Sequence, residues 1–220
     1  DSYTETTVSG TPSLSITGLT AETDYYARVK AVCGAADEST WSGTCLFTPT
    51  RKTIVGSGIA TNAYLPTHNY YKYSLTQQIY TPSELGDAGD IVSIDFYKNN
   101  GVECKRYLDI YMVSTTKSVF SDDSDWVAVT AADKVFSDTV YFADNAWTTI
   151  TLDTPFGYDG THNIVIVVDD NTGSYKSNTP FLAFSAPSQA IRIYSDNINN
   201  DAFAQSKIGR AVQQECRDRS

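Results

Sequence analysis

Long apolar runs and an excess of basic residues are both missing from this 220-residue sequence. No stretch approaches the roughly 20 apolar residues that a membrane-spanning helix needs, so we expect no membrane span. Lys and Arg number 16 against 26 Asp and Glu, which gives a net charge of -10. Because an acidic surface repels the phosphates of nucleic acids, we expect no nucleic-acid partner.

Residues that commonly carry catalysis are also scarce. The two histidines, His68 and His162, cannot make a three-histidine zinc site, and no G-x-S-x-G, H-E-x-x-H or C-x-x-C motif occurs. After residue 50 the only glutamates are Glu84, Glu103 and Glu215, and most aspartates stand in turn-like contexts, where they cap the backbone. We therefore predict that the protein is not an enzyme. A glycoside hydrolase or peptidase, whose site would assemble from distant residues, stays as an alternative.

What the sequence does contain is β-strand patterning. It has 15 Tyr and 9 Phe but one Met, and runs of helix-forming residues are few. Apolar and polar residues alternate over residues 25–32, 92–97 and 108–112, and glycines stand between many of the apolar runs. Residues 163–168 are apolar on both faces, which is typical of a central strand. We predict an all-β protein.

The composition changes near residues 48–56, where Pro49 stands between two threonines and is followed by Arg51 and Lys52. We place a domain boundary there, with one domain over residues 1–50 and a second over residues 51–220. The chain begins at Asp1 rather than Met, so we expect a fragment or a processed product.

The first domain resembles a known family. Residues 19–25 read Leu-Thr-Ala-Glu-Thr-Asp-Tyr and resemble the corner between strands E and F of a fibronectin type III domain, and residues 40–48 resemble its closing strand. The resemblance implies that Tyr25 is the tyrosine-corner residue and that residues 1–50 are the C-terminal part of such a sandwich. Ala21 stands where the family usually has Pro.

The second domain resembles modules of Bacteroidetes surface proteins that follow fibronectin type III domains. More distantly, it is similar to the jelly-roll adhesin modules of gingipain-type proteins. The segments that carry the resemblance are residues 73–80, 108–112, 135–137, 147–152, 155–160 and 168–174. It implies a jelly-roll-like β-sandwich, for which a barrel is the main rival, in a secreted or surface-attached bacterial protein. Residues 206–220 do not alternate, so we expect a short helix or a disordered tail there.

Four cysteines allow two disulfides. In the fibronectin type III interpretation, Cys33 ends one strand and Cys45 lies in the next, so antiparallel pairing would bring them together, and we predict this disulfide. A bridge between Cys104 and Cys216 stays open, as do free thiols.

Clustered Asp and Asn residues raise the question of a cation. Residues 122–125, 169–173 and 196–201 could each offer oxygen ligands to calcium, and the strongest candidates are Asp169, Asp170 and Asn171. None of the three segments has the spacing of an EF-hand. The alternative is an Asx-turn without metal, so the cofactor prediction is either none or a structural calcium ion.

The aromatic residues offer a candidate binding surface. Tyr70, Tyr71 and Tyr73 stand close together beside His68, and Trp126 follows an acidic run. Aromatic faces with amides nearby can stack on sugars or pack against protein partners, although strand tyrosines more often pack against their neighbours. We predict a non-catalytic adhesion or carbohydrate-binding module whose partner is a glycan or a host or cell-surface protein. The second interpretation is a structural spacer, and the oligomeric state stays open.

Overall fold

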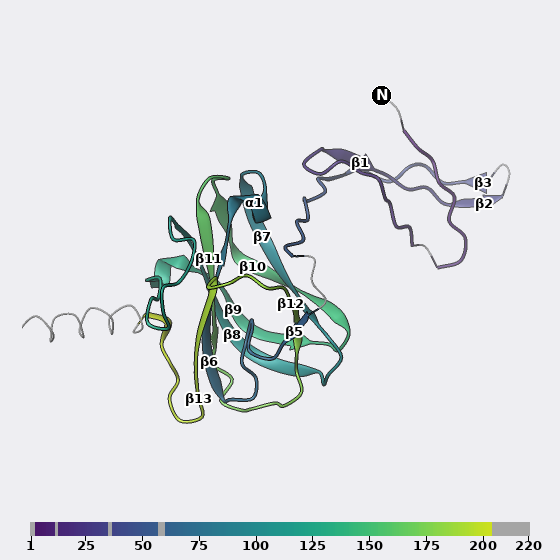
Figure 1. Ribbon diagram of the computed structural model, residues 1–220. Helices are drawn as coiled ribbons and strands as arrows, with labels where there is room; N and C mark the ends of the chain where they lie inside the picture. The colour runs from purple at the N-terminus through teal and green to yellow at the C-terminus, as the bar shows by residue number, and fades with distance from the viewer. Residues whose placement is uncertain (1–2, 12, 35–36, 57–59, 204–220) are drawn as a thin grey trace, which may run out of the picture. The chain divides into compact units, whose positions relative to one another are not determined.

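The computed structural model describes residues 3–11, 13–34, 37–56 and 60–203, and the chain divides into two compact units, Asp1–Ile54 and Val55–Ser220 (Figure 1). We call these unit 1 and unit 2. The division falls four residues beyond the boundary that the composition suggests. Residues 206–220, including Cys216, lie outside the described residues, so the predictions made for them stay predictions. No helix of the described part is long and apolar enough to cross a membrane.

Unit 1 is built from short strands: β1 (Tyr25–Ala27), β2 (Val32–Gly34), β3 (Asp37–Glu38) and β4 (Cys45–Phe47). β1 pairs with β4 and β2 pairs with β3, both antiparallel, and backbone bonds from Ser42 to Val29 and from Ser39 to Ala31 join the two pairs into one irregular hairpin. No described residue of unit 1 is buried, so its strands contribute no core of their own.

The corner that precedes β1 has one defined hydrogen bond. The backbone N–H of Thr20 donates to the hydroxyl of Tyr25 over 2.9 Å, and the Tyr25 ring stacks on Phe47 with 6.0 Å between ring centroids. A tyrosine whose hydroxyl bonds to backbone a few residues upstream is the local feature of a tyrosine corner. The bond ties the turn before β1 to the hairpin.

The predicted Cys33–Cys45 disulfide is not formed, because the two thiols are free and exposed. The register of the hairpin explains the error. Cys45 lies in β4 opposite Ala27 of β1, whereas Cys33 lies six residues farther along the chain, in β2, which pairs with β3. At about 3.3 Å per strand residue this is ~20 Å, far beyond the Cα separation of under ~7 Å that a disulfide allows.

Unit 2 is an antiparallel two-sheet sandwich, which confirms the all-β prediction (Figure 1). One sheet has the order β10-β7-β12-β5 and the other β13-β6-β11-β8-β9. From β5 to β8 successive strands alternate between the two sheets, which gives the jelly-roll-like connectivity. The strands are β5 (Ala60–Asn62), β6 (Tyr73–Tyr80), β7 (Gly89–Lys98), β8 (Cys104–Thr115), β9 (Lys134–Phe142), β10 (Ala146–Tyr158), β11 (Asn163–Asp170), β12 (Phe181–Ala183) and β13 (Ala190–Ser195). The described part of the unit also contains α1 (Pro82–Leu85) and the 3-10 turn η1 (Ala131–Asp133).

The five-stranded sheet is covered on both faces. Its inner face packs against the four-stranded sheet in a core that includes Leu108, Ile110, Ile164, Ile166 and Phe181. Its outer face is covered by residues from the β8–β9 connection and from the segment after β13, in a cluster that includes Leu75, Phe120, Val129, Val165 and Ala202. The two-sided apolar strand therefore lies where the sequence predicts, as β11 in the middle of this sheet.

Candidate ligand-binding site

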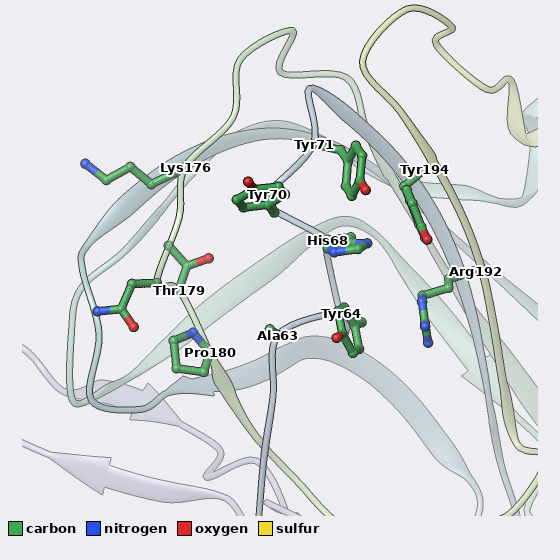
Figure 2. A pocket seen from close by; sticks show the side chains of 11 residues that line it. Ala63, Tyr64, His68, Tyr70, Tyr71, Lys176, Thr179, Pro180, Arg192 and Tyr194 are labelled. Carbon is green, nitrogen blue, oxygen red and sulfur yellow. The ribbon is translucent and has the colours of Figure 1, made fainter.

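A pocket of about 490 Å³ lies at the edge of the sandwich beside β13 (Figure 2). Three stretches that are far apart in the sequence line it: the β5–β6 connection, the β11–β12 connection and β13 itself. We call it the tyrosine pocket. The lining residues are Ala63, Tyr64, His68, Tyr70, Tyr71, Lys176, Asn178, Thr179, Pro180, Arg192 and Tyr194.

His68 lies at the centre of one wall. Its ring makes edge contacts with the rings of Tyr64, Tyr71 and Tyr194, with centroid separations of 4.7, 4.8 and 4.4 Å. Only 5% of the residue is exposed, and Nδ1 makes no hydrogen bond within the described part of the chain. Burial, aided by the positive charge of Arg192, lowers the pKa of His68 to about 4. The imidazole is therefore neutral at pH 7. It packs between the rings of Tyr64, Tyr71 and Tyr194 and helps to hold them in place.

The loop that carries His68 is held by buried hydrogen bonds. Asn69 is fully buried, donates through its side-chain amide to the hydroxyl of Thr179 over 3.0 Å, and accepts the N–H of Lys176 at its carbonyl over 2.6 Å. The backbone N–H of His68 donates to the hydroxyl of Ser74 over 3.0 Å. These bonds connect two of the three lining stretches, so the pocket walls are fixed relative to each other.

A buried ion pair also helps to hold the β5–β6 and β11–β12 connections in place. Arg106 and Asp170, both within 1% of full burial, form a salt bridge on the inner side of the five-stranded sheet. The remaining guanidinium N–H groups donate to the carbonyl of Tyr71 over 3.2 Å and to that of Ser174 over 2.7 Å. Arg106 therefore connects the backbone of the β5–β6 connection to that of the β11–β12 connection.

The charge lining the pocket is positive. Figure 2 shows Arg192 on one side and Lys176 on the other. The guanidinium of Arg192 lies 4.3 Å from the ring centroid of Tyr64, a cation–π contact. Neither side chain forms an ion pair with a carboxylate of the described residues, and none of the eleven lining residues is Asp or Glu. The lining of the pocket is thus positively charged, whereas the protein as a whole has a net negative charge.

The tyrosine hydroxyls of the pocket are unoccupied by protein groups. Within the described residues, the hydroxyls of Tyr64, Tyr70, Tyr71 and Tyr194 form no hydrogen bond with another residue. Tyr70 is 61% exposed and sits at the mouth, where it contacts Tyr71 and Tyr175 at ring-centroid separations of 5.7 and 6.3 Å. Four tyrosines whose hydroxyls have no partner in the described chain therefore line the same hollow.

The structure brings together two of the four aromatic residues predicted to bind a ligand. Tyr70 and Tyr71 line the pocket, but Tyr73 begins β6 with its hydroxyl near Gly173. Trp126 packs on the outer cluster and donates its indole N–H to the carbonyl of Asp123 over 3.0 Å. Trp126 and Tyr73 are therefore not among the pocket residues.

Sequence reasoning missed Tyr64, Lys176, Arg192 and Tyr194. A partial signal exists for two of them, because Arg192 and Tyr194 alternate on a strand and so share one face. Nothing in the sequence joins that face to residues 64–71. The pairing of β13 with β6 creates this proximity, since Tyr194 lies opposite Ser74 in the register.

The three residues predicted to bind calcium have other partners. Asp170 is engaged by Arg106, and its second carboxylate oxygen accepts the N–H of Thr172 over 3.1 Å, which is an Asx-turn. Asn171 accepts a hydrogen bond from Asn199 over 2.6 Å. Asp169 points to the other face of β11, into the outer cluster. The described residues hold no group of three or more His, Cys, Asp or Glu side chains that could hold a metal ion, so the structure does not support the calcium prediction.

The geometry around the two histidines bears on the hydrolase alternative. His162 is half-exposed, and its Nδ1 lies 2.5 Å from the carboxylate of Asp159 and 3.3 Å from the hydroxyl of Thr161. Asp159 also accepts the N–H groups of Thr161 and His162, and these bonds lower the pKa of its carboxyl group. The imidazole contacts in the described chain are thus with a turn carboxylate, a threonine and tyrosine rings, not with serine or cysteine.

Comparison with known proteins returned no match. Neither a protein-family model, nor a curated protein sequence, nor a solved structure matches the chain. The interpretation of the tyrosine pocket therefore rests on its own geometry.

Proposed function

We propose that unit 2 is a non-catalytic carbohydrate-binding module and that the tyrosine pocket is its ligand site. The observation that carries the proposal is the convergence of four tyrosines whose hydroxyls have no partner in the described chain, on walls held by buried hydrogen bonds. Aromatic rings stack on the C–H faces of sugars, and the hydroxyls supply the polar contacts that fix orientation.

The size and rigidity of the pocket support the same proposal. A volume of about 490 Å³ lies within the ~300–1,000 Å³ that is ordinary for small-ligand sites. The lining loops are connected through Asn69 and Arg106, so little ordering is needed when a ligand enters. A preformed, tyrosine-lined hollow suits a sugar better than it suits a protein surface, which needs a larger contact area.

The setting of the module belongs to the proposal as well. We infer that it serves adhesion on a bacterial surface or in a secreted protein, with unit 1 as part of a fibronectin type III-like spacer. The sequence resemblance supports this setting, as does the tyrosine-corner bond between Thr20 and Tyr25. We expect binding to persist in the presence of a chelator, because the pocket is lined by cations and hydroxyls rather than by carboxylates.

A glycan array probed with the full 220-residue chain tests the proposal. We expect reproducible binding to one class of glycan, and about threefold to tenfold weaker binding for Tyr70→Ala, which removes an exposed stacking surface. The matched control is Tyr26→Ala, because Tyr26 is an exposed tyrosine of unit 1 that does not line the pocket.

Thermal melting of each variant shows whether the fold is intact. The proposal fails if no glycan binds, or if folded Tyr70→Ala binds as well as the wild type and Tyr26→Ala. The first of these outcomes would leave the spacer interpretation for the whole chain.

A further inference from the structure

The two cations that line the tyrosine pocket, Arg192 and Lys176, are not neutralised by a carboxylate of the described residues. Several bases outside the pocket are neutralised by carboxylates, namely Lys30, Lys98, Arg106, Lys117 and Lys134. Five described bases have no such partner, although the chain carries ten more acidic than basic side chains, and two of the five line the pocket: Arg28, Lys72, Lys105, Lys176 and Arg192, of which Lys176 and Arg192 are the lining residues. Two unpaired cations that flank a hollow without any acidic lining residue are a complement to negative charge.

The placement of Arg192 favours a planar anion. Its guanidinium carbon lies 4.3 Å from the centroid of the Tyr64 ring, and this cation–π contact holds the guanidinium at the pocket wall. A guanidinium held in this way presents parallel donors that match the two oxygens of a carboxylate. Lys176, an exposed residue on the other side of the pocket, adds a second positive charge to the lining, and Figure 2 shows its side chain extended away from Arg192.

The lining side chains around Arg192 carry no negative charge that would compete with an anionic ligand for its guanidinium. His68 packs beside it in the pocket wall, and the imidazole is neutral at pH 7 because its pKa is about 4. Tyr64, Tyr71 and Tyr194 line the same pocket, and their hydroxyls, which have no partner in the described chain, can donate to sugar oxygens. No carboxylate of the lining residues competes with a ligand for the guanidinium.

We propose that the tyrosine pocket selects sugars that carry a carboxylate group, with Arg192 as the carboxylate-binding residue, Lys176 as a second anion contact and the tyrosines as the stacking surface. This inference rests on the proposed carbohydrate-binding function and names its ligand class. Hexuronates and sialates share this chemistry, so both are included in the test.

Calorimetric titration of the full chain with four matched probes tests the proposal. The probes are a hexuronate oligosaccharide, a sialylated oligosaccharide, a neutral oligosaccharide of equal length and a sulfated oligosaccharide of equal length. We expect at least one carboxylated probe to bind at least about tenfold more tightly than the neutral and sulfated probes. The two carboxylated probes then show which source supplies the ligand.

Three variants assign the effect to the pocket. Arg192→Gln should weaken binding of the carboxylated probe about tenfold or more and leave the weak binding of the neutral probe unchanged. Arg192→Lys keeps the charge but loses the paired donors, so it should restore only part of the affinity. Lys105→Gln, at an exposed lysine of β8 outside the pocket, removes the same unit of charge and should bind as the wild type does.

The possible outcomes distinguish a failure of the carboxylate selectivity from a failure of the proposed carbohydrate binding. Tighter binding of a neutral probe than of both carboxylated probes would overturn the carboxylate selectivity while leaving a sugar-binding pocket. Equal loss of affinity in Arg192→Gln and Lys105→Gln, or equal binding of sulfated and carboxylated probes, would show a general charge effect and overturn it too. Binding of no probe, in protein that melts normally, would contradict the proposed function itself.

Discussion

At the scale of single residues, the carboxyl group of Asp169 lies where a charge is disfavoured. The residue is 5% exposed in the outer cluster, and Oδ1 has no hydrogen-bond partner in the described chain. In the strand register it lies directly opposite Asp109, whose carboxylate is paired with Lys134. Burial, and then the charge of Asp109, raise the pKa of Asp169 to about 7.

This raised pKa makes stability depend on pH in a defined direction. The folded chain keeps the Asp169 proton up to about pH 7, whereas the unfolded chain loses it near pH 3.8. Between these values the folded state binds more protons, so this residue's contribution to stability falls as the pH rises. His68 acts with the opposite sign, because its pKa of about 4 lies below its ordinary 6.5, and its contribution is lost as the pH falls through that window.

We expect Asp169→Asn to stabilise unit 2 at pH 8 and to have little effect at pH 3.5. The amide resembles the protonated carboxyl group, so the free energy of unfolding at pH 8 should increase by about 1–4 kcal/mol, from ~1.4 kcal/mol for each unit of pKa shift. Urea unfolding at the two pH values measures the difference. Asp138→Asn, at an exposed aspartate of β9, is the control, and an equal change at both pH values would contradict the prediction.

At the scale of elements, the hairpin of unit 1 shows why the predicted disulfide failed. Strand alternation placed Cys33 and Cys45 on neighbouring strands, but the pairing partner depends on where the turn falls. β2 pairs with β3 and β1 pairs with β4, so Cys33 lies in one strand pair and Cys45 in the other, opposite Ala27. A sequence pattern of period two fixes which face a residue occupies, but not the residue opposite.

A cysteine placed opposite Cys45 should form the bond that Cys33 cannot. In Ala27→Cys the new thiol is the direct cross-strand neighbour of Cys45, at a separation within the range of a disulfide. We expect mass spectrometry of a non-reduced digest of oxidised protein to show this link. Ala27→Ser is the control, and pairing of the introduced thiol with Cys33 would show that the register is different.

The elements of unit 2 were easier to predict than its site. Residues 163–168 could be predicted as a central strand because they are apolar on both faces. This pattern requires burial on both faces however the other strands are arranged. Tyr70 and Tyr71 were recognisable because they adjoin each other in the sequence. Lys176 and Arg192 could not be recognised as site residues from the sequence. Only long-range strand pairing brings the β11–β12 connection and β13, which carry these two residues, close to Tyr70 and Tyr71.

At the scale of the whole molecule, the buried residues are all in unit 2 among the described part of the chain. Unit 1 therefore depends on its hairpin hydrogen bonds, which are exposed and open at low cost. The two units should differ sharply in resistance to unfolding and to proteases.

Limited trypsin digestion should release a resistant fragment that begins at Lys52 or Thr53. Arg51 and Lys52 are exposed in a stretch without regular secondary structure, whereas Lys98 and Arg106 of unit 2 are buried. N-terminal sequencing and mass spectrometry identify the product over time. Arg51→Gln with Lys52→Gln should slow its appearance, and cleavage inside β6–β11 at the same rate as at residue 51 would contradict the difference between the units.

The tyrosine pocket is assembled from the beginning and the end of unit 2, and this has a consequence for biosynthesis. Tyr64 to Tyr71 leave the ribosome early, but Arg192 and Tyr194 follow only after nearly all of the sandwich has been translated. A nascent chain therefore cannot capture ligand, and truncation before β13 yields a product without a complete pocket. By mass action, a ligand of this pocket would stabilise the completed unit and not a chain truncated before β13.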